Sequence, residues 1–329
     1  MKDTDYLSIS ARVRAMENRL LTRERQERMI EARTDDEALK ILAECGYEEP
    51  EDLSVPALNR VLAKAREELF QDLKGAVPDP ALVEVFQIKY DYHNAKVLLK
   101  AEAVGEEADR LLMEGGRYAP KTLAENFRRG DLRDYSDPFR GAVEQAGAAL
   151  SDGGDPQEAD LILDRACYGE MAAAAKASGS AFLQGYVKLA VDAVNLRVAV
   201  RCQRMGAGAE LLAKSLLPGG NVSPQAVAAA KGGELAQRFR STPLERAAEV
   251  GAELASPEAG SLTAFEKLCD DALTAYLAQA RRTSFGEQPV VGYLCAREAE
   301  ATAIRTILAG RMAGLSADAI RERLRDTYV

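Results

Sequence analysis

The sequence predicts an all-α protein, because composition, helix-start signals and an internal repeat all favour helices. Apolar residues make up 47% of the 329 residues, aromatic residues only 6%, and tryptophan is absent. Alanine, leucine, glutamate and arginine dominate instead, and all four have high helix propensity. This apolar fraction is sufficient for a sizeable core.

The net charge limits the classes of partner that the chain can bind, and the cysteine spacing indicates its redox compartment. The formal net charge is −9, so the chain offers no basic footprint for nucleic acid or an anionic membrane surface. Five cysteines are dispersed without CxxC spacing, which is typical of a reduced cytoplasmic protein. The polar opening predicts no signal peptide, and no apolar run reaches the ~18 residues of a membrane span. We expect a cytoplasmic protein, which can still sit beside a membrane.

The first helix is expected to extend from Asp5 to Ala32. Arginine and glutamate alternate along it, which favours a solvated face, with a partner-facing helix as the alternative. Its apolar residues recur at alternating spacings of three and four, as in a heptad seam: Tyr6, Ile9, Val13, Met16 and Leu20.

Later helix starts follow a regular pattern of capping residues. Thr34 and Glu37 form a capping-box sequence. Six further sites place a capping residue before a proline, which is tolerated at the first helical position because its missing N–H would have no partner there. These signals predict about twelve to sixteen helices with short connectors. The capping residues before proline are Asp79, Asp137, Asp155, Ser223, Thr242 and Ser256.

A threefold internal repeat organises the chain. Each copy has an acid, a base five residues later and a glycine nine residues after the base, and the acids are separated by 101 and 108 residues. Residues 115–124 also match residues 219–228, whereas the third copy lacks this tail. The repeat divides the chain into units at residues 1–128, 129–234 and 235–329, within one compact domain. The three copies are Asp91, Lys96 and Gly105; Asp192, Arg197 and Gly206; and Glu300, Arg305 and Gly314.

The spacing of acid and base predicts links between helices. Five residues advance a helix by about 140°, so Asp192 and Arg197 cannot pair well within one helix and should each reach a neighbour. Asn94 and Asn195 lie three residues after the acids, near the same face. We favour polar stitching within a helical bundle. The alternative is a ring of polar groups lining a central opening.

Motifs for catalysis or metal binding are weak. His93 is the single histidine, so Ser/His/Asp and Cys/His arrangements would all depend on it, and we expect a structural or core role. Residues 208–215 imitate a phosphate loop but lack its second glycine and read as helix. Asp270 and Asp271 begin a DDxxD-like motif, but Thr274 occupies its fifth position. We expect no catalytic residue, cofactor or metal.

Four stretches resemble the C subunit of the bacterial and archaeal V-type (A/V-type) ATP synthases, a family related to the d subunit of eukaryotic V-ATPases. The resemblance extends from Tyr6 to Val329. The stretches are the opening at residues 6–17 with its A-R-x-R core, the D-x-x-N helix at 91–96, the D-x-x-N-L-R segment at 191–197, and the Y-x-x-x-R-E-x-E helix at 293–300 with Arg305 and Gly310.

The resemblance implies a fold and a role. The fold would be three similar helical units in a pseudo-threefold funnel. The role would be a non-catalytic adaptor in the central stalk, between the D and F shaft proteins and the proteolipid ring in the membrane. It would transmit torque for ATP synthesis or hydrolysis coupled to ion transport, from a cytoplasmic position peripheral to the membrane. No small-molecule substrate or nucleic acid is implied. A helical-repeat scaffold of another cytoplasmic assembly is the alternative, followed by an all-helical enzyme.

The charged residues within these motifs are the candidate contacts with partners or between units. Five arginines accompany the motifs and cannot all be satisfied within their own helices, so we expect them at the inner surface or between units. The full candidate set is Arg12, Arg14, Asp91, Asn94, Asp192, Asn195, Arg197, Arg297, Glu300 and Arg305.

Overall fold

The computed structural model describes residues 2–329, except for the side chain of Asp152, and it confirms the all-α prediction. These residues form sixteen α-helices and four short 3-10 helices, with no strand among them. Six helices are long: α4 (Val55–Ala76), α5 (Ala81–Val104), α8 (Pro156–Ala177), α9 (Ala181–Arg204), α14 (Thr263–Ala278) and α15 (Glu287–Met312).

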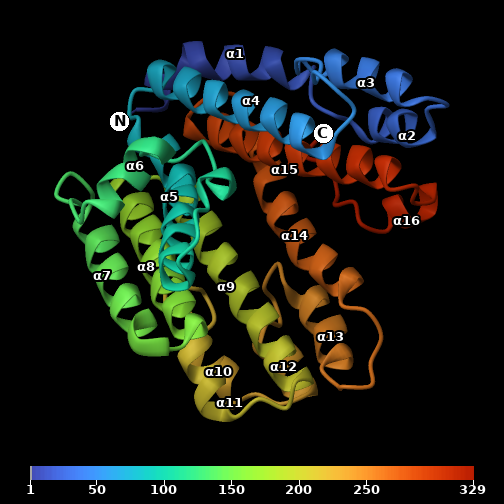
Figure 1. Cartoon of the computed structure of the whole chain (residues 1–329). Helices are drawn as coiled ribbons and strands as arrows, with labels where there is room; N and C mark the ends of the chain where they lie inside the picture. The colour runs from blue at the N-terminus through green and yellow to red at the C-terminus, as the bar shows by residue number, and fades with distance from the viewer. Residues whose placement is uncertain (1) are drawn as a thin grey trace.

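The other helices are shorter and connect or cover the long ones (Figure 1). They are α1 (Leu7–Glu17), α2 (Arg23–Glu31), α3 (Asp35–Glu44), α6 (Pro120–Arg128), α7 (Asp137–Leu150), α10 (Ala209–Ser215), α11 (Pro224–Ala229), α12 (Gly233–Arg238), α13 (Glu245–Leu254) and α16 (Ala317–Arg321). The 3-10 helices are η1 (Asp3–Tyr6), η2 (Asp109–Leu111), η3 (Ser151–Gly153) and η4 (Gln279–Arg282).

The long helices contact one another along a closed path. The path runs from α4 to α5, α8, α9, α14 and α15, and α15 returns to α4. The helices that carry the repeated acids are α5, α9 and α15, here called the inner helices, and α15 contacts both of the others. This path is compatible with three units around an axis, and the pseudo-threefold funnel stays a prediction.

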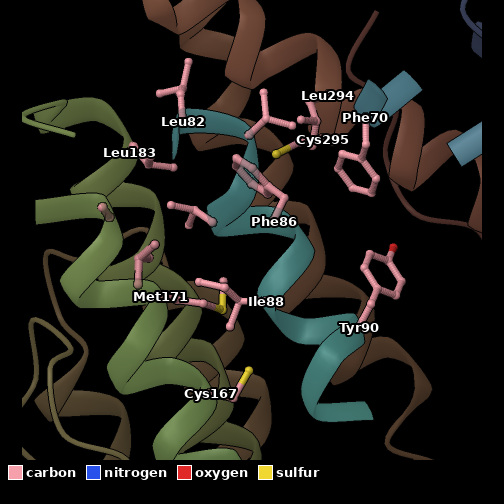
Figure 2. Packing of buried hydrophobic residues seen from close by; sticks show 14 of the residues in the cluster. Phe70, Leu82, Phe86, Ile88, Tyr90, Cys167, Met171, Leu183, Leu294 and Cys295 are labelled. Atoms are coloured by element: carbon pink, nitrogen blue, oxygen red, sulfur yellow. The ribbon is translucent and has the colours of Figure 1, made fainter. Parts of the chain in front are cut away.

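The inner helices share one core near their first turns. Phe86 of α5, Leu183 of α9 and Leu294 of α15 are all buried in it, and Figure 2 shows Phe86 and Leu183 on facing helices. Complete burial of such a side chain contributes about 1.5–3 kcal/mol. The three helices are therefore joined firmly at this end.

The second halves of α9 and α15 enter separate cores, whereas the second half of α5 stays in the shared core. Val200 on α9 packs in a core with residues of α10 to α14. Ile304 and Leu308 on α15 pack in a third core with residues of α2, α3 and the start of α4. The inner helices therefore diverge from their shared base, as Figure 1 shows.

The predicted single helix over residues 5–32 is wrong. The chain forms η1 and α1, turns at residues 18–22, and begins α2 at Arg23. Leu20 and Leu21 are both buried at this turn, and the Thr22 hydroxyl accepts the Arg25 N–H at 3.2 Å as the cap of the new helix. The Arg25 guanidinium also donates to the Leu20 carbonyl at 2.6 Å. Tertiary burial and capping thus override the heptad pattern.

Most of the predicted capping sites lie at or beside helix starts. Thr34, Asp155 and Ser223 each accept a backbone N–H in the first turn of a helix, as predicted. The Asp137 site shifts by one residue, because Ser136 is the cap of α7. Ser256 is wrong as a helix start: it lies in a turn, and the next helix, α14, begins only at Thr263.

Candidate functional site

Asp91 of α5 holds the loop that follows its own helix. Its buried carboxylate accepts the N–H groups of Arg117 at 2.9 Å and Tyr118 at 3.3 Å, and it pairs with the Arg117 guanidinium at 2.6 Å. Asn94, one turn later, donates to the Met113 carbonyl at 2.9 Å and accepts the Met113 N–H at 2.8 Å. Together, Asp91 and Asn94 fix the backbone of residues 113–118.

The electrostatics of Asp91 involve a second carboxylate. Burial raises the pKa of Asp91 to about 6, although the Arg117 guanidinium opposes this shift. Arg117 also pairs with Glu170 of α8 at 2.7 Å, and Glu170 accepts a hydrogen bond from the Tyr92 hydroxyl at 2.9 Å. Burial raises the pKa of Glu170, but Arg117, Ser136 and Tyr92 together lower it more, so the net shift is downward. Arg117 therefore joins α5 to α8.

Asp192 and Asn195 of α9 repeat this geometry. The Asp192 carboxylate accepts the Asn221 N–H at 3.0 Å and the Val222 N–H at 3.0 Å. Asn195 donates to the Leu217 carbonyl at 2.8 Å and accepts its N–H at 2.7 Å. In both copies the acid and the amide bind backbone, and each acid also accepts a hydrogen bond from the side chain that follows a glycine, Arg117 at 2.6 Å or Asn221 at 2.9 Å.

A glycine lies directly beside each of these two carboxylates. A Cβ atom added to Gly116 would overlap Asp91 Oδ1, and one added to Gly220 would overlap Asp192 Oδ1. Backbone and carboxylate approach this closely only when the side chain is absent. Gly116 and Gly220 occupy the same position in the matched stretches 115–124 and 219–228, and each allows the backbone to approach the repeated carboxylate closely.

Glu300 of α15 takes a different set of partners. Its carboxylate is only 5% exposed, and it accepts hydrogen bonds from the Leu21 N–H, the Arg297 guanidinium and, at 2.8 Å, the Tyr47 hydroxyl. Burial raises the pKa of Glu300, with Arg297 opposing the shift. Arg297 also donates to the Cys45 carbonyl at 3.2 Å. Glu300 and Arg297 thereby connect α15 to the N-terminal helices.

The repeated bases bind neighbouring helices. Lys96 of α5 pairs with Asp164 of α8 at 2.7 Å, and Arg197 of α9 pairs with Asp270 of α14. Both pairs cross the predicted unit boundaries at residues 128 and 234. Arg305 is exposed, and no ion pair of Arg305 is found among the described residues.

The two arginines of α1 make contacts of different kinds. Arg12 forms a largely exposed ion pair with Asp72 of α4. Arg14 pairs with Glu17 at 2.8 Å and donates to the carbonyls of Ala280 and Thr283, each at 2.6 Å. Arg14 therefore attaches α1 to the segment between α14 and α15.

A cavity of about 370 Å³ lies between the inner helices, α14 and the C-terminal segment. Lys89 of α5, Tyr186 of α9 and Glu298 of α15 line it, together with residues 323–329. Of the candidate residues, Glu300 lines this cavity, whereas the acids and amides of α5 and α9 do not. The acids and amides of α5 and α9 bind loops instead, and the polar ring around a central opening stays a prediction.

An ion pair between Lys89 and Glu298, which was not predicted from the sequence, joins α5 to α15 within this cavity. The Tyr90 hydroxyl also donates to Glu298, and the Arg66 guanidinium lies 4.7 Å from the Tyr90 ring centroid. Burial lowers the pKa of Lys89, but Glu298, Tyr90 and Tyr186 together raise it more, and the net shift is upward. Glu298 lies within the motif at residues 293–300, and this was the one feature of the sequence that could have indicated the ion pair.

The weak motifs have structural roles. His93 is exposed on α5, so it is not a core histidine, and a structural role stays a prediction. Residues 209–215, which resemble a phosphate loop in sequence, form helix α10 as predicted. Asp270 pairs with Arg197 and Arg325, and Asp271 pairs with Lys267 at 2.6 Å. Across the described residues, no group of three or more His, Cys, Asp or Glu side chains could hold a metal ion.

Cys202 is expected to be the thiol that reacts first in the folded protein. Cys45, Cys167 and Cys269 are buried, and burial raises the pKa of each to about 12, so almost none is thiolate at pH 8. Cys295 is buried with its pKa raised as well, whereas Cys202 is partly exposed.

The measurement is a thiol titration with Ellman's reagent at pH 8. We expect about one fast-reacting thiol in the native protein and all five in guanidinium chloride. The Cys202→Ser variant should lose the fast phase. A fast phase that persists in this variant would contradict the assignment.

The helices and contacts define a class of protein: an all-helical chain whose buried carboxylates hold loops and whose ion pairs join long helices. Within residues 2–329, no helix combines the length and the apolar character that crossing a membrane requires. The profile of the ATP synthase (C/AC39) subunit family matches residues 9–323. The chain belongs to this family, which confirms the resemblance found in its sequence.

Two relatives align over nearly the whole chain, and a third aligns over part of it. The C subunit of the V-type sodium ATPase of Enterococcus hirae is 24% identical over 325 residues, covering 98% of this chain and 99% of that protein. The C subunit of the A-type ATP synthase of Haloquadratum walsbyi is 26% identical, covering 95% and 96%. The C subunit of the V-type ATP synthase of Thermus thermophilus is 25% identical over 209 residues, covering 61% and 64%.

Proposed function

We propose that this protein is the non-catalytic adaptor of the central stalk in a V-type ATP synthase or ATPase. It would couple the shaft formed by the D and F proteins to the proteolipid ring, on the cytoplasmic side and peripheral to the membrane. The observation that carries the proposal is the family match over residues 9–323, with relatives of the same family aligned along 98% and 95% of the chain.

The contacts between helices support a mechanical role. Torque transmission requires a body that does not shear, and close-packed helices provide low compressibility. Ion pairs also cross the helix seams, including Lys96 with Asp164, Arg197 with Asp270 and Lys89 with Glu298. The conspicuous charged residues are thus engaged in joining helices, which favours a structural role over an enzymatic one.

Co-elution tests this function. The purified protein is mixed with the D–F heterodimer and, separately, with the detergent-solubilised proteolipid ring, and each mixture is run on size exclusion. Stoichiometric co-elution with both is expected. Binding to neither, by a protein that is helical by circular dichroism, would overturn the proposal and favour a helical scaffold of another cytoplasmic assembly.

Charge reversal at Arg305 is expected to weaken binding to one of these partners without changing stability. Arg305 is exposed and occupies the third repeat's base position, but no ion pair of it is found in the described chain. The Arg305→Glu variant should bind about tenfold more weakly, equivalent to about 1.4 kcal/mol. Isothermal titration and a thermal melt give the two readouts.

The matched control for this variant is Arg238→Glu at the end of α12, where the arginine is also exposed and no ion pair of it is found among the described residues. It should bind as the wild type does. Equal binding by Arg305→Glu and the wild type to both partners would remove Arg305 from the contact surface.

A further inference from the structure

We infer that the N-terminal segment, residues 18–54, completes the third repeat unit. Beside α15, this segment takes the place that residues 105–128 take beside α5 and residues 207–230 take beside α9. The N-terminal segment would then be an intramolecular latch over the junction of α15 and α4, the last and first members of the closed path. Such a latch is a property of the isolated chain and goes beyond the proposed function.

The repeated acids bind loops that come from different parts of the chain. Asp91, Asp192 and Glu300 occupy the same position in the inner helices, fourteen residues before a glycine with positive φ at Gly105, Gly206 and Gly314. Asp91 and Asp192 accept N–H groups from the loop that follows their helix. Glu300 accepts the N–H of Leu21, which lies 279 residues earlier in the chain. The loop bound by the third acid thus comes from the N-terminal segment.

Apolar packing places the same segment over α15. Three short helices that follow α9 in the chain contact α9 and share a core with its second half. They are α10, α11 and α13. The second half of α15 is covered instead by α2 and α3, which bring Met29 and Leu42 against Ile304 and Leu308 in one core. Met29, Leu42 and Ile304 are completely buried, so the N-terminal helices are an integral cover of α15.

In each case the next long helix along the closed path contributes to the same core. Phe265 and Cys269 of α14 pack in the core of α9. Leu58 and Leu62 of α4 pack in the core of α15 with α2 and α3. The order of elements around α15 therefore matches the order around α9, with α2 and α3 in place of α10 to α13.

Polar contacts continue this cover to the end of α15. Arg311 donates to the Ile30 carbonyl at 2.8 Å and pairs with Asp35 at 3.0 Å. Arg321 of α16 pairs with Glu27 at 2.9 Å and Glu31 at 2.7 Å. These contacts bind α2 and α3 along the whole second half of α15 and to the helix after it.

Hydrogen exchange of the full-length protein, measured by mass spectrometry, tests the inference. Leu42→Ala is introduced in α3, where the side chain is completely buried. Amide exchange is expected to accelerate about tenfold or more in residues 23–47 and, to the same extent, in residues 301–321. Residues 94–128, which include the end of α5 and α6, should exchange as in the wild type.

The matched control is Leu123→Ala in α6, a buried leucine in the tail of the first unit. It should accelerate exchange in residues 94–128 and leave residues 301–321 unchanged. Tyr47→Phe provides a milder second variant, because it removes only the 2.8 Å hydrogen bond from the Tyr47 hydroxyl to Glu300. It should accelerate the same two segments, 23–47 and 301–321, by a smaller factor.

Two outcomes would overturn the inference. In one, Leu42→Ala and Tyr47→Phe accelerate residues 23–47 while residues 301–321 keep wild-type exchange, so that the N-terminal helices open alone. In the other, residues 94–128 open together with residues 23–47, which would assign the segment to the first unit. Neither outcome involves the shaft or the ring, so a failure here is distinct from a failure of the adaptor role.

Discussion

Replacing Glu300 with alanine is expected to lower the free energy of unfolding by about 3–5 kcal/mol. The substitution removes the acceptor for the Leu21 N–H and the Tyr47 hydroxyl and leaves the Arg297 guanidinium without its carboxylate partner. All these groups are buried or nearly so, and a buried unpaired charge is far less favourable than an exposed one. Urea unfolding followed by circular dichroism at 222 nm gives the measurement.

The control for this substitution is Glu31→Ala. Glu31 pairs with Arg321, but its side chain is 66% exposed, and exposed ion pairs contribute about 0–1 kcal/mol. If Glu300→Ala is no more destabilising than Glu31→Ala, the buried network does not stabilise the fold.

A pH series distinguishes the charge of Glu300 from its packing. Burial raises the pKa of Glu300 above its ordinary value of 4.5, so the folded state binds its proton more tightly than the unfolded state. The stability that this group contributes is therefore fully present below 4.5 and is lost as the pH rises through the folded pKa. As the pH rises from 4.5 through the folded pKa, the free energy of unfolding of the wild type should fall relative to that of Glu300→Gln.

Gly220→Ala is expected to destabilise the fold by about 2–5 kcal/mol, combining overpacking with strained buried hydrogen bonds. The new Cβ would overlap Asp192 Oδ1 and lie 3.0 Å from Asp192 Cγ, so the loop must move away from α9. That movement weakens the hydrogen bonds from the N–H groups of Asn221 and Val222, each 3.0 Å from Asp192. Gly116→Ala should act similarly at Asp91.

Gly169→Ala is the matched control for Gly220→Ala. Gly169 lies inside α8, and no atom lies within 4 Å of the position its Cβ would take. Alanine there should leave the stability unchanged or raise it by about 0.5–1 kcal/mol, because glycine is a poor helix former. Denaturant midpoints of both variants make the comparison, and equal midpoints would show that the close approach at Gly220 is unimportant.

Local features of the fold could be predicted from the sequence. Composition and capping residues report on single helices, and therefore the all-α class and starts such as Thr34 followed without tertiary information. The break at residues 18–22 was missed because the heptad pattern runs across it. Burial of Leu20 and Leu21 and the cap of Thr22 determine the break, and burial is a property of the assembled molecule.

The candidate site was located by its repeat but not explained by it. Asp91 and Asp192 bind backbone N–H groups, and a backbone group leaves no mark in the sequence. The partners of Glu300 lie in the first 50 residues, at a separation that no helical periodicity can report. The ion pair of Lys89 with Glu298 likewise exists only because α5 and α15 meet.

The pairing of the first helices with α15 has a consequence for synthesis on the ribosome. Leu21 leaves the peptidyl-transferase centre 279 residues before Glu300, which at 5–20 residues per second is roughly 15–55 s earlier. During this interval Met29 and Leu42 lack the part of their apolar core that Ile304 and Leu308 of α15 contribute in the finished protein. The contact between α2, α3 and α15 therefore forms only after α15 has been synthesised, and the N-terminal helices wait for this partner through most of the intervening chain.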